Sequence, residues 1–210
     1  MSKAVKKRAI DDEYFYESSD FSLYHAHLKI SDLDKNTTQP FSTKNHTISF
    51  IGEIYNTTHL CDIFQIQSNI SEIEMLSELY WKLWANFVEY LNGEFAISVY
   101  DKIKHKLLLF RDRYGTKPLY YSMKDNQLLF STELWSFIQE TSKLNQKNIY
   151  NHMIFGFWIS PESLLHWVYS IVPWTYIAYN WVDVQTIKYS HYITSETQEA
   201  NFMETLENSI

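Results

Sequence analysis

The stretch Arg111-Asp112-Arg113-Tyr114-Gly115-Thr116-Lys117-Pro118-Leu119-Tyr120-Tyr121 does most to decide the fold of this chain. The flanking segments Lys106 to Phe110 and Leu119 to Ser122 are short apolar runs, which predict two strands. Gly115 and Pro118 mark a turn between them, because these residues favour backbone angles that turns need. We expect the three charged residues that open the stretch to form an ion-pair network that fixes this turn rather than a catalytic cluster.

Working outward, alternating polar and apolar residues predict further strands, and strand-like composition returns near the end of the chain. The expected strand segments are Ser22 to Ile30, Thr47 to Phe50, Phe95 to Tyr100, Gln127 to Ser131, and Val168 to Tyr192 with a turn near Pro173. Apolar residues at a helical period predict one helix from Ser71 to Leu91, with Ser71 as its N-cap. Further helices are expected at Glu133 to Thr141, Gln146 to Phe155 and Glu196 to Ile210. Helices and strands in blocks indicate an α+β fold with an antiparallel sheet.

Composition narrows the function classes. The 210 residues suit one domain, and the net charge of -7 argues against nucleic-acid and anionic-membrane partners. A single cysteine, Cys61, excludes an internal disulfide and a thiolate zinc cage, so we expect a reducing, cytoplasmic setting with no signal peptide. Leu164 to Val182 has no charged residue other than a histidine, but its Val, Ile, Thr and Tyr content favours buried strands over a membrane helix.

Three further motifs extend the first. They are Gly52-Glu53-Ile54-Tyr55-Asn56, Leu91-Asn92-Gly93-Glu94-Phe95-Ala96 and Ser131-Thr132-Glu133-Leu134. In this order and spacing the chain, from about Arg8 to Tyr192, resembles the glutaminase domain of asparagine synthetase, a class II glutamine amidotransferase of the N-terminal-nucleophile hydrolase fold. All four glycines and all four prolines fall where the family has them. The resemblance implies a four-layer αββα sandwich of two antiparallel sheets between helices.

The same resemblance implies a glutaminase chemistry that this chain lacks in part. The family nucleophile is an N-terminal cysteine on the first strand, whose free amine activates its own thiol. Here Arg8 to Asp12 matches the family's segment after that strand, so the first strand and the nucleophile are missing. Ser2 is a formal replacement with too few residues around it, and Cys61 fits a buried structural thiol better.

The remaining positions of the family's glutamine site have also changed. Its oxyanion asparagine corresponds to Ile51, which has no side-chain donor. Its carboxylate-binding arginine corresponds to His27 and its amine-binding aspartate to Glu72, while Gly52 and Glu53 are retained. We expect no catalytic residue and a degenerate substrate site of His27, Gly52, Glu53 and Glu72. A structural role for Gly52 and Glu53 is favoured over ligand binding.

The histidines and two of the tryptophans were also considered as functional residues. The eight histidines show no metal-ligand spacing, and His25 and His27 lack a third partner, so no metal or other cofactor is expected. Trp167 and Trp174 stand where the family has glycine. Because tryptophan strains a backbone with positive φ, we expect that loop to be rebuilt with new apolar surface, a common mark of a partner contact.

The C-terminal residues bear on whether the chain could bind ATP or make asparagine by itself. Residues 1–195 are expected to form the amidotransferase-like domain, and 196–210 to begin a helix leading to a synthetase domain, of which no pyrophosphate loop is present. The favoured hypothesis is a domain inactive as a glutaminase that acts as a structural or interaction module. Its expected partner is an ATP-pyrophosphatase chain or a second copy of itself. The alternatives are a truncated piece of a glutamine-hydrolysing asparagine synthetase and a module that senses glutamine or another amino acid.

Overall fold

The computed structural model describes residues 12–27, 38–139 and 141–189. In chain order the strands and helices are β1 Asp12–Glu17, β2 Ser22–His27, β3 Phe41–Ser42, β4 His46–Ile54, α2 Thr57–Phe64, α3 Glu72–Leu83, the 3-10 helix η2 Trp84–Tyr90, β5 Gly93–Asp101, β6 Lys106–Arg111, β7 Tyr120–Lys124, β8 Gln127–Ser131, the 3-10 helix η3 Leu134–Phe137, α4 Gln146–Phe155, β9 Val168–Ser170, β10 Thr175–Tyr179 and β11 Val184–Lys188.

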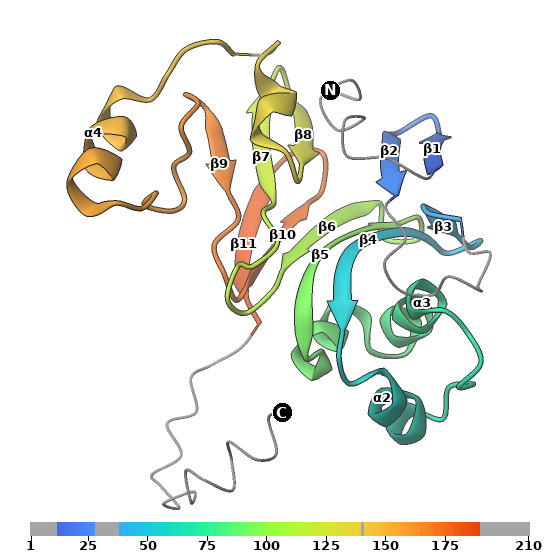
Figure 1. The fold of residues 1–210 in the computed structure, drawn as a ribbon. Coiled ribbons are helices and arrows are strands. Elements are labelled where there is room, and N and C mark those ends of the chain that lie inside the picture. The colour runs from blue at the N-terminus through green and yellow to red at the C-terminus, as the bar shows by residue number, and fades with distance from the viewer. Residues whose placement is uncertain (1–11, 28–37, 140, 190–210) are drawn as a thin grey trace, which may run out of the picture.

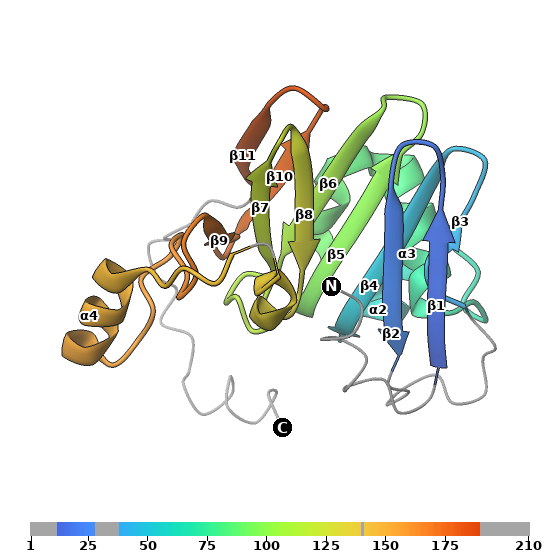
Figure 2. The ribbon, with the colours of Figure 1, turned by 90° about the horizontal axis from the view of Figure 1, so that it is seen from above.

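An antiparallel sheet in the order β11-β10-β6-β5-β4-β3 forms the centre of the described structure. Helices α2 and α3 cover one face, and the β1-β2 hairpin and the β8-β7-β9 sheet lie over the other (Figures 1 and 2). Helix α4 stands beside β9 at the margin of the molecule. The expected α+β fold with antiparallel sheets and flanking helices is confirmed.

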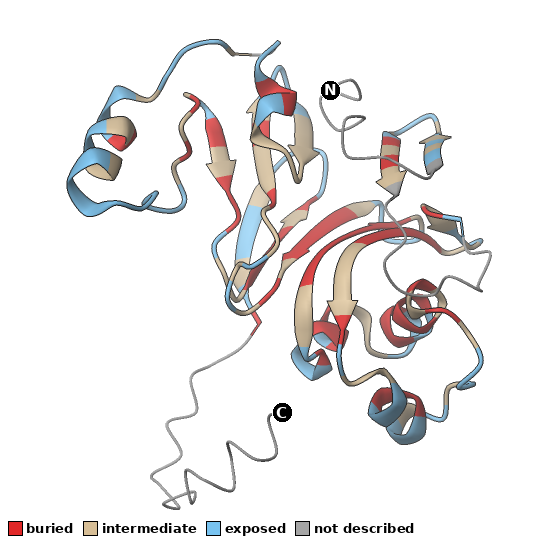
Figure 3. Ribbon diagram, in the orientation of Figure 1, coloured by how far each residue is buried: buried red, intermediate tan, exposed pale blue. Residues whose placement is uncertain are grey.

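The central sheet is apolar on both faces because each face has its own core. In β5 the side chains of Phe95, Ile97 and Val99 pack towards the helices, whereas Ala96 and Tyr100 pack towards the smaller sheets. The four residues Leu107 to Phe110 of β6 are therefore all buried, as in a strand that is covered on both sides (Figure 3).

Several elements differ from the sequence prediction. The helix expected to reach Leu91 ends at Leu83, because Trp84 adopts φ 52° and ψ −139°, and a 3-10 helix follows. The helix expected at Glu133 to Thr141 is a short 3-10 turn. The strand β1 was not predicted, and the expected helix at Glu196 to Ile210 lies outside the described residues.

The loop around Trp167 and Trp174 carries the expected apolar surface, because Trp167 is 64% exposed. Both residues have positive φ angles, 67° and 68°, which we expected tryptophan to avoid. Leu164 to Val182 contains β9, β10 and connecting loops, and among the described residues no helix is long and apolar enough to cross a membrane. The strands predicted for this segment are confirmed.

Candidate active site

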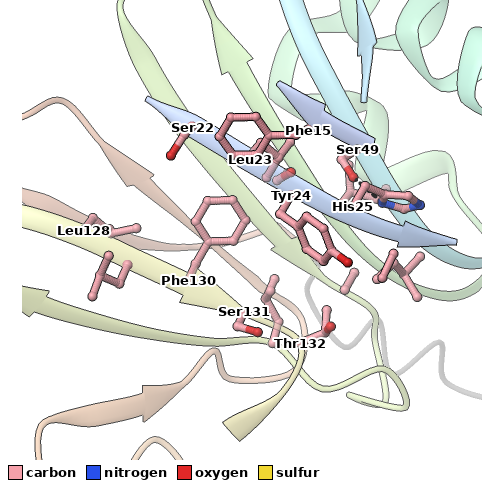
Figure 4. A pocket seen from close by; sticks show the side chains of 17 residues that line it. Phe15, Ser22, Leu23, Tyr24, His25, Ser49, Leu128, Phe130, Ser131 and Thr132 are labelled. Carbon is pink, nitrogen blue, oxygen red and sulfur yellow. Dashed lines mark hydrogen bonds between the residues drawn. The ribbon is translucent and has the colours of Figure 1, made fainter. Parts of the chain in front are cut away.

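The candidate site is a pocket of about 300 Å³ between the two small sheets and the central sheet. One wall is β2, from Ser22 to Ala26, and the opposite wall is β8 with Thr132 (Figure 4). The central sheet contributes residues from β4 and β5 as the floor. Of the positions that the resemblance assigns to the glutamine site, Ile51 lines this pocket, whereas Gly52, Glu53 and Glu72 are not part of its lining. Three separate segments of the chain build the pocket.

Ile51 lies on the pocket floor. In the β4-β5 register Ile51 is opposite Ala96 and Ser49 is opposite Ser98, so these four side chains point to the same face of the sheet. Ile51 offers only a branched alkyl group to the pocket. A site that stabilises an oxyanion needs hydrogen-bond donors aimed at the developing charge, and this side chain has none.

Gly52 has a backbone reason to be glycine. Its φ is 130°, and a Cβ atom added there would lie 1.9 Å from the carbonyl oxygen of Glu94 on the neighbouring strand. The close approach of β4 and β5 therefore requires the missing side chain. This geometry supports the structural reading of Gly52 whatever the pocket binds.

The two acidic candidates stand beside the pocket and do not line it. Glu53 is half-buried and lies opposite Glu94, whose carboxylate pairs with the ammonium group of Lys117 at 2.7 Å. Oε1 of Glu72, in the first turn of α3, accepts a hydrogen bond from the backbone N–H of Ile54 at 3.2 Å. Glu72 thus ties the start of α3 to the end of β4.

Strand β2 carries two of the histidines considered from the sequence, His25 and His27. His25 lines the pocket, is buried, and its Nδ1 lies 2.9 Å from Oγ of Ser49, a hydrogen bond between β2 and β4. The backbone of His27 closes β2 opposite Asp12, and its side chain lies outside the described part of the structure. Ser2 also lies outside it.

The turn after β6 is held by backbone hydrogen bonds and not by the ion-pair network that we expected. The fully buried carboxylate of Asp112 accepts from the N–H groups of Phe95, Tyr114, Thr116 and Lys117 at 2.9 to 3.3 Å. The guanidinium group of Arg111 donates to the carbonyls of Gly115, Lys117 and Ile171 and to Oγ of Ser170. Burial lowers the pKa of Arg111. Because both groups are engaged in hydrogen bonds, mostly to backbone atoms, they stabilise the turn, which supports a structural role for it.

Cys61 is buried in the helix-side core, away from the pocket. Among the described residues no three His, Cys, Asp or Glu side chains are placed to share a metal ion. Several pocket residues were not singled out from the sequence, among them Tyr24, Ser49 and Phe130. The register of β4 and β5 could have indicated Ser49, since it lies two residues before Ile51 on the same face.

Comparisons with known proteins identify the family of this chain. A model of the glutamine amidotransferase domain matches residues 1–192. Asparagine synthetase (glutamine-hydrolyzing) 2 of Bacillus subtilis is 32% identical over 167 residues, which cover 78% of this chain and 22% of the relative. Amidase chry2 of Gibberella zeae is 35% identical over 131 residues, which cover 60% of this chain and 19% of the relative. The chain thus spans about a fifth of the length of these relatives.

Solved structures show the same fold. Glutamine phosphoribosylpyrophosphate amidotransferase from B. subtilis superposes with a TM-score of 0.51 at 17% identity, over 72% of this chain and 32% of that one. The family model, the relatives and the two antiparallel layers agree. The chain therefore belongs to the class II glutamine amidotransferase domain family.

Proposed function

We propose that this chain is an asparagine-synthetase-type amidotransferase domain that does not hydrolyse glutamine and serves as a structural or interaction module. The observation that carries the proposal is Ile51 on the pocket floor, at the position that the resemblance assigns to an oxyanion donor. Loss of one such donor costs about 10²- to 10³-fold in rate. The degenerate substrate site would comprise His27, Gly52, Glu53 and Glu72, with no catalytic residue and no cofactor.

The module would span residues 1–195, with 196–210 leading away from it, and would act in the cytoplasm. Its partner would be an asparagine-synthetase-like ATP-pyrophosphatase chain or a second copy. The relatives support this partner class, because two of them are named glutamine-hydrolyzing asparagine synthetases and are several times longer than this chain. Exposed apolar side chains on and after α4, such as Met153, Ile154 and Phe157, offer surface for such a contact.

The decisive experiment follows glutamine turnover in the purified chain. The folded chain is incubated with glutamine while ammonia is measured, and then with a diazo-ketone glutamine analogue before intact-mass analysis. Ile51→Asn is the matched variant, and Asparagine synthetase B of Escherichia coli is the positive control. We expect no ammonia and no adduct from either form of the chain. Ammonia release with an adduct on one residue would contradict the proposal and identify the nucleophile.

A second candidate is a piece of a complete glutamine-hydrolysing asparagine synthetase. The coverage of about a fifth of the relatives favours it. Genomic sequence on both sides of the reading frame distinguishes the two, because a piece would be continuous with a nucleophile strand and a synthetase domain. Restoring these would still leave Ile51 in the oxyanion position. Amino-acid sensing without cleavage is tested by calorimetric titration of the chain with free amino acids.

A further inference from the structure

The pocket lies between two edge strands, β2 and β8, and one further strand could pair with both of them. Strand β2 is the edge of the β1-β2 hairpin, and β8 is the edge of the β8-β7-β9 sheet. Both edges border the same pocket, and among the described residues neither is paired with a further strand. Figure 2 shows the two strands side by side and pointing the same way. We call this space, between Ser22 to Ala26 and Leu128 to Ser131, the β2/β8 slot.

Hairpin geometry identifies the backbone groups that face the slot. In the β7-β8 hairpin Lys124 and Gln127 flank the two-residue turn, so the hydrogen-bonded pairs involve Gln127, Leu129 and Ser131. The N–H and C=O groups of Leu128 and Phe130 therefore point away from β7. In the other hairpin the bond from the Ser18 N–H to the Phe21 carbonyl sets the same alternation. Tyr24 and Ala26 consequently turn their backbone groups away from β1.

The floor of the slot has room for side chains. It is built from the small residues Ser49, Ala96 and Ser98 together with Ile51, whereas Leu23, Leu119 and Phe130 make its sides apolar. A strand laid in the slot antiparallel to β2 and β8 would bond to both edges and place every second side chain on this floor. The two small sheets would then become one continuous sheet.

We infer that the β2/β8 slot binds an extended segment of a partner chain, with apolar side chains at alternate positions, as an added β-strand. Residues 1–11 fit this role poorly. They include Lys3, Lys6, Lys7 and Arg8, and they lead directly into Asp12, opposite the end of β2. A segment joined there would run parallel to β2 unless it first spanned the sheet and returned. The inference rests on the proposed function, because a strand in the slot would occupy the pocket offered above as the candidate site.

A synthetic peptide tests the inference. The probe is an acetylated seven-residue peptide of alternating threonine and valine, followed by a labelled lysine, and its binding to the full chain is followed by fluorescence anisotropy. Leu128→Pro removes one N–H that faces the slot, and proline is tolerated on an edge strand. Thr186→Pro on β11 is the matched control, because β11 is an edge strand remote from the slot and the β10-β11 register turns the Thr186 backbone away from β10.

We expect saturable binding to the unsubstituted chain and to Thr186→Pro, weakened at least tenfold by Leu128→Pro and abolished by a proline at the centre of the peptide. Equal binding to both variants, or none to the unsubstituted chain, would overturn the inference. So would slow hydrogen exchange of the Tyr24 and Leu128 amides without peptide, because the slot would then already be filled by the chain itself.

A separate observation concerns the tryptophans. The chain has seven tryptophans and four glycines, and none of the seven is buried. Four of them have positive φ, Trp84 at 52°, Trp167 at 67°, Trp174 at 68° and Trp181 at 69°. A bulky residue in this region is an outlier, and the ψ of −139° places Trp84 near backbone angles that glycine alone adopts readily.

The local contexts are also those of glycine. Trp84 is the C-cap of α3 and donates its N–H to the carbonyl of Tyr80. Trp181 is the first of the two residues between Asn180 and Asp183, where hairpin turns of type II′ have glycine. Trp174 follows Pro173 directly and donates its N–H to the carbonyl of Asp112.

We infer that the natural polypeptide carries glycine at Trp84, Trp167, Trp174 and Trp181. A UGA codon specifies tryptophan in some genetic codes and glycine in others, so translation in the former code places tryptophan at such glycines. Peptide mass spectrometry of the protein from its natural source tests this. Peptides with the mass of glycine at these positions would support the inference, and peptides with tryptophan would overturn it. We also expect the fourfold Trp→Gly variant to melt at a higher temperature than the present chain. A lower melting temperature would contradict glycine at these positions.

Discussion

Replacing Asp112 by alanine tests the reading that the turn after β6 is held by one buried carboxylate. Its two oxygens accept four backbone N–H groups, and no part of the residue is exposed to solvent. A hydrogen bond to a charged group contributes about 1.5 to 3 kcal/mol, but bonds that share one acceptor are not additive. The donors of Tyr114 and Thr116 belong to exposed residues, so water replaces part of the loss.

We therefore expect Asp112→Ala to lower the free energy of unfolding by about 3 to 5 kcal/mol. Urea unfolding followed by far-ultraviolet circular dichroism measures it. Asp112→Asn should not rescue stability, because its amide N–H₂ would face backbone donors. The control is Asp62→Ala on an exposed turn of α2, with an expected change within about 0.5 kcal/mol. A loss below about 1 kcal/mol for Asp112→Ala would refute the reading.

Three further outcomes are expected. Burial lowers the pKa of His46, so below about pH 6.5 the unfolded chain takes up a proton that the folded imidazole resists. The free energy of unfolding should decrease as the pH is lowered from 7.5 to 5.5, and His46→Gln should make this decrease smaller. An unchanged decrease in the variant would contradict the role of His46. Cys61, 7% exposed, should react with iodoacetamide roughly 10²-fold more slowly than a short peptide thiol; equal rates would show an accessible thiol. Gly52→Ala should cost at least about 2 kcal/mol in urea unfolding, since its Cβ meets the Glu94 carbonyl, whereas a neutral result would mean that β4 and β5 separate easily.

The sequence was informative where local chemistry decides structure. The bounds of β8 and α4 agree with prediction, because β8 follows the tight Asp125–Asn126 turn and α4 lies between the Asn145 cap and Gly156. The end of α3 was missed, since apolar residues continue at the helical period to Leu91 and the break depends on one backbone angle at Trp84. The strand β1 was missed although Tyr14, Phe15 and Tyr16 favour a strand, and its pairing with β2 completes the hairpin.

For the candidate site, the sequence suggested individual residues but not their surroundings. Ile51 could be placed by its motif, yet its position on a floor between two sheet edges follows from long-range pairing. The sequence predicted apolar surface at this loop, and Trp167 is 64% exposed, but it did not predict that both Trp167 and Trp174 have positive φ. Hydrogen bonds to distant segments position Trp174. The Trp174 N–H bonds to the Asp112 carbonyl, and Tyr189 bonds back to the Trp174 carbonyl. Such constraints come from segments far apart in the chain.

The division of the central sheet into two faces has a consequence for how this protein tolerates sequence change. Ile48, Phe50, Ile97 and Phe110 pack on the helices, whereas Ser49, Ile51, Ala96 and Ser98 face the pocket. Mutational scanning should therefore show an alternating pattern at Ile48 to Ile51 and at Ala96 to Ser98, with less tolerance on the helix side than among the residues that line the pocket. A scaffold built in this way can lose or change its chemistry one residue at a time without losing its fold.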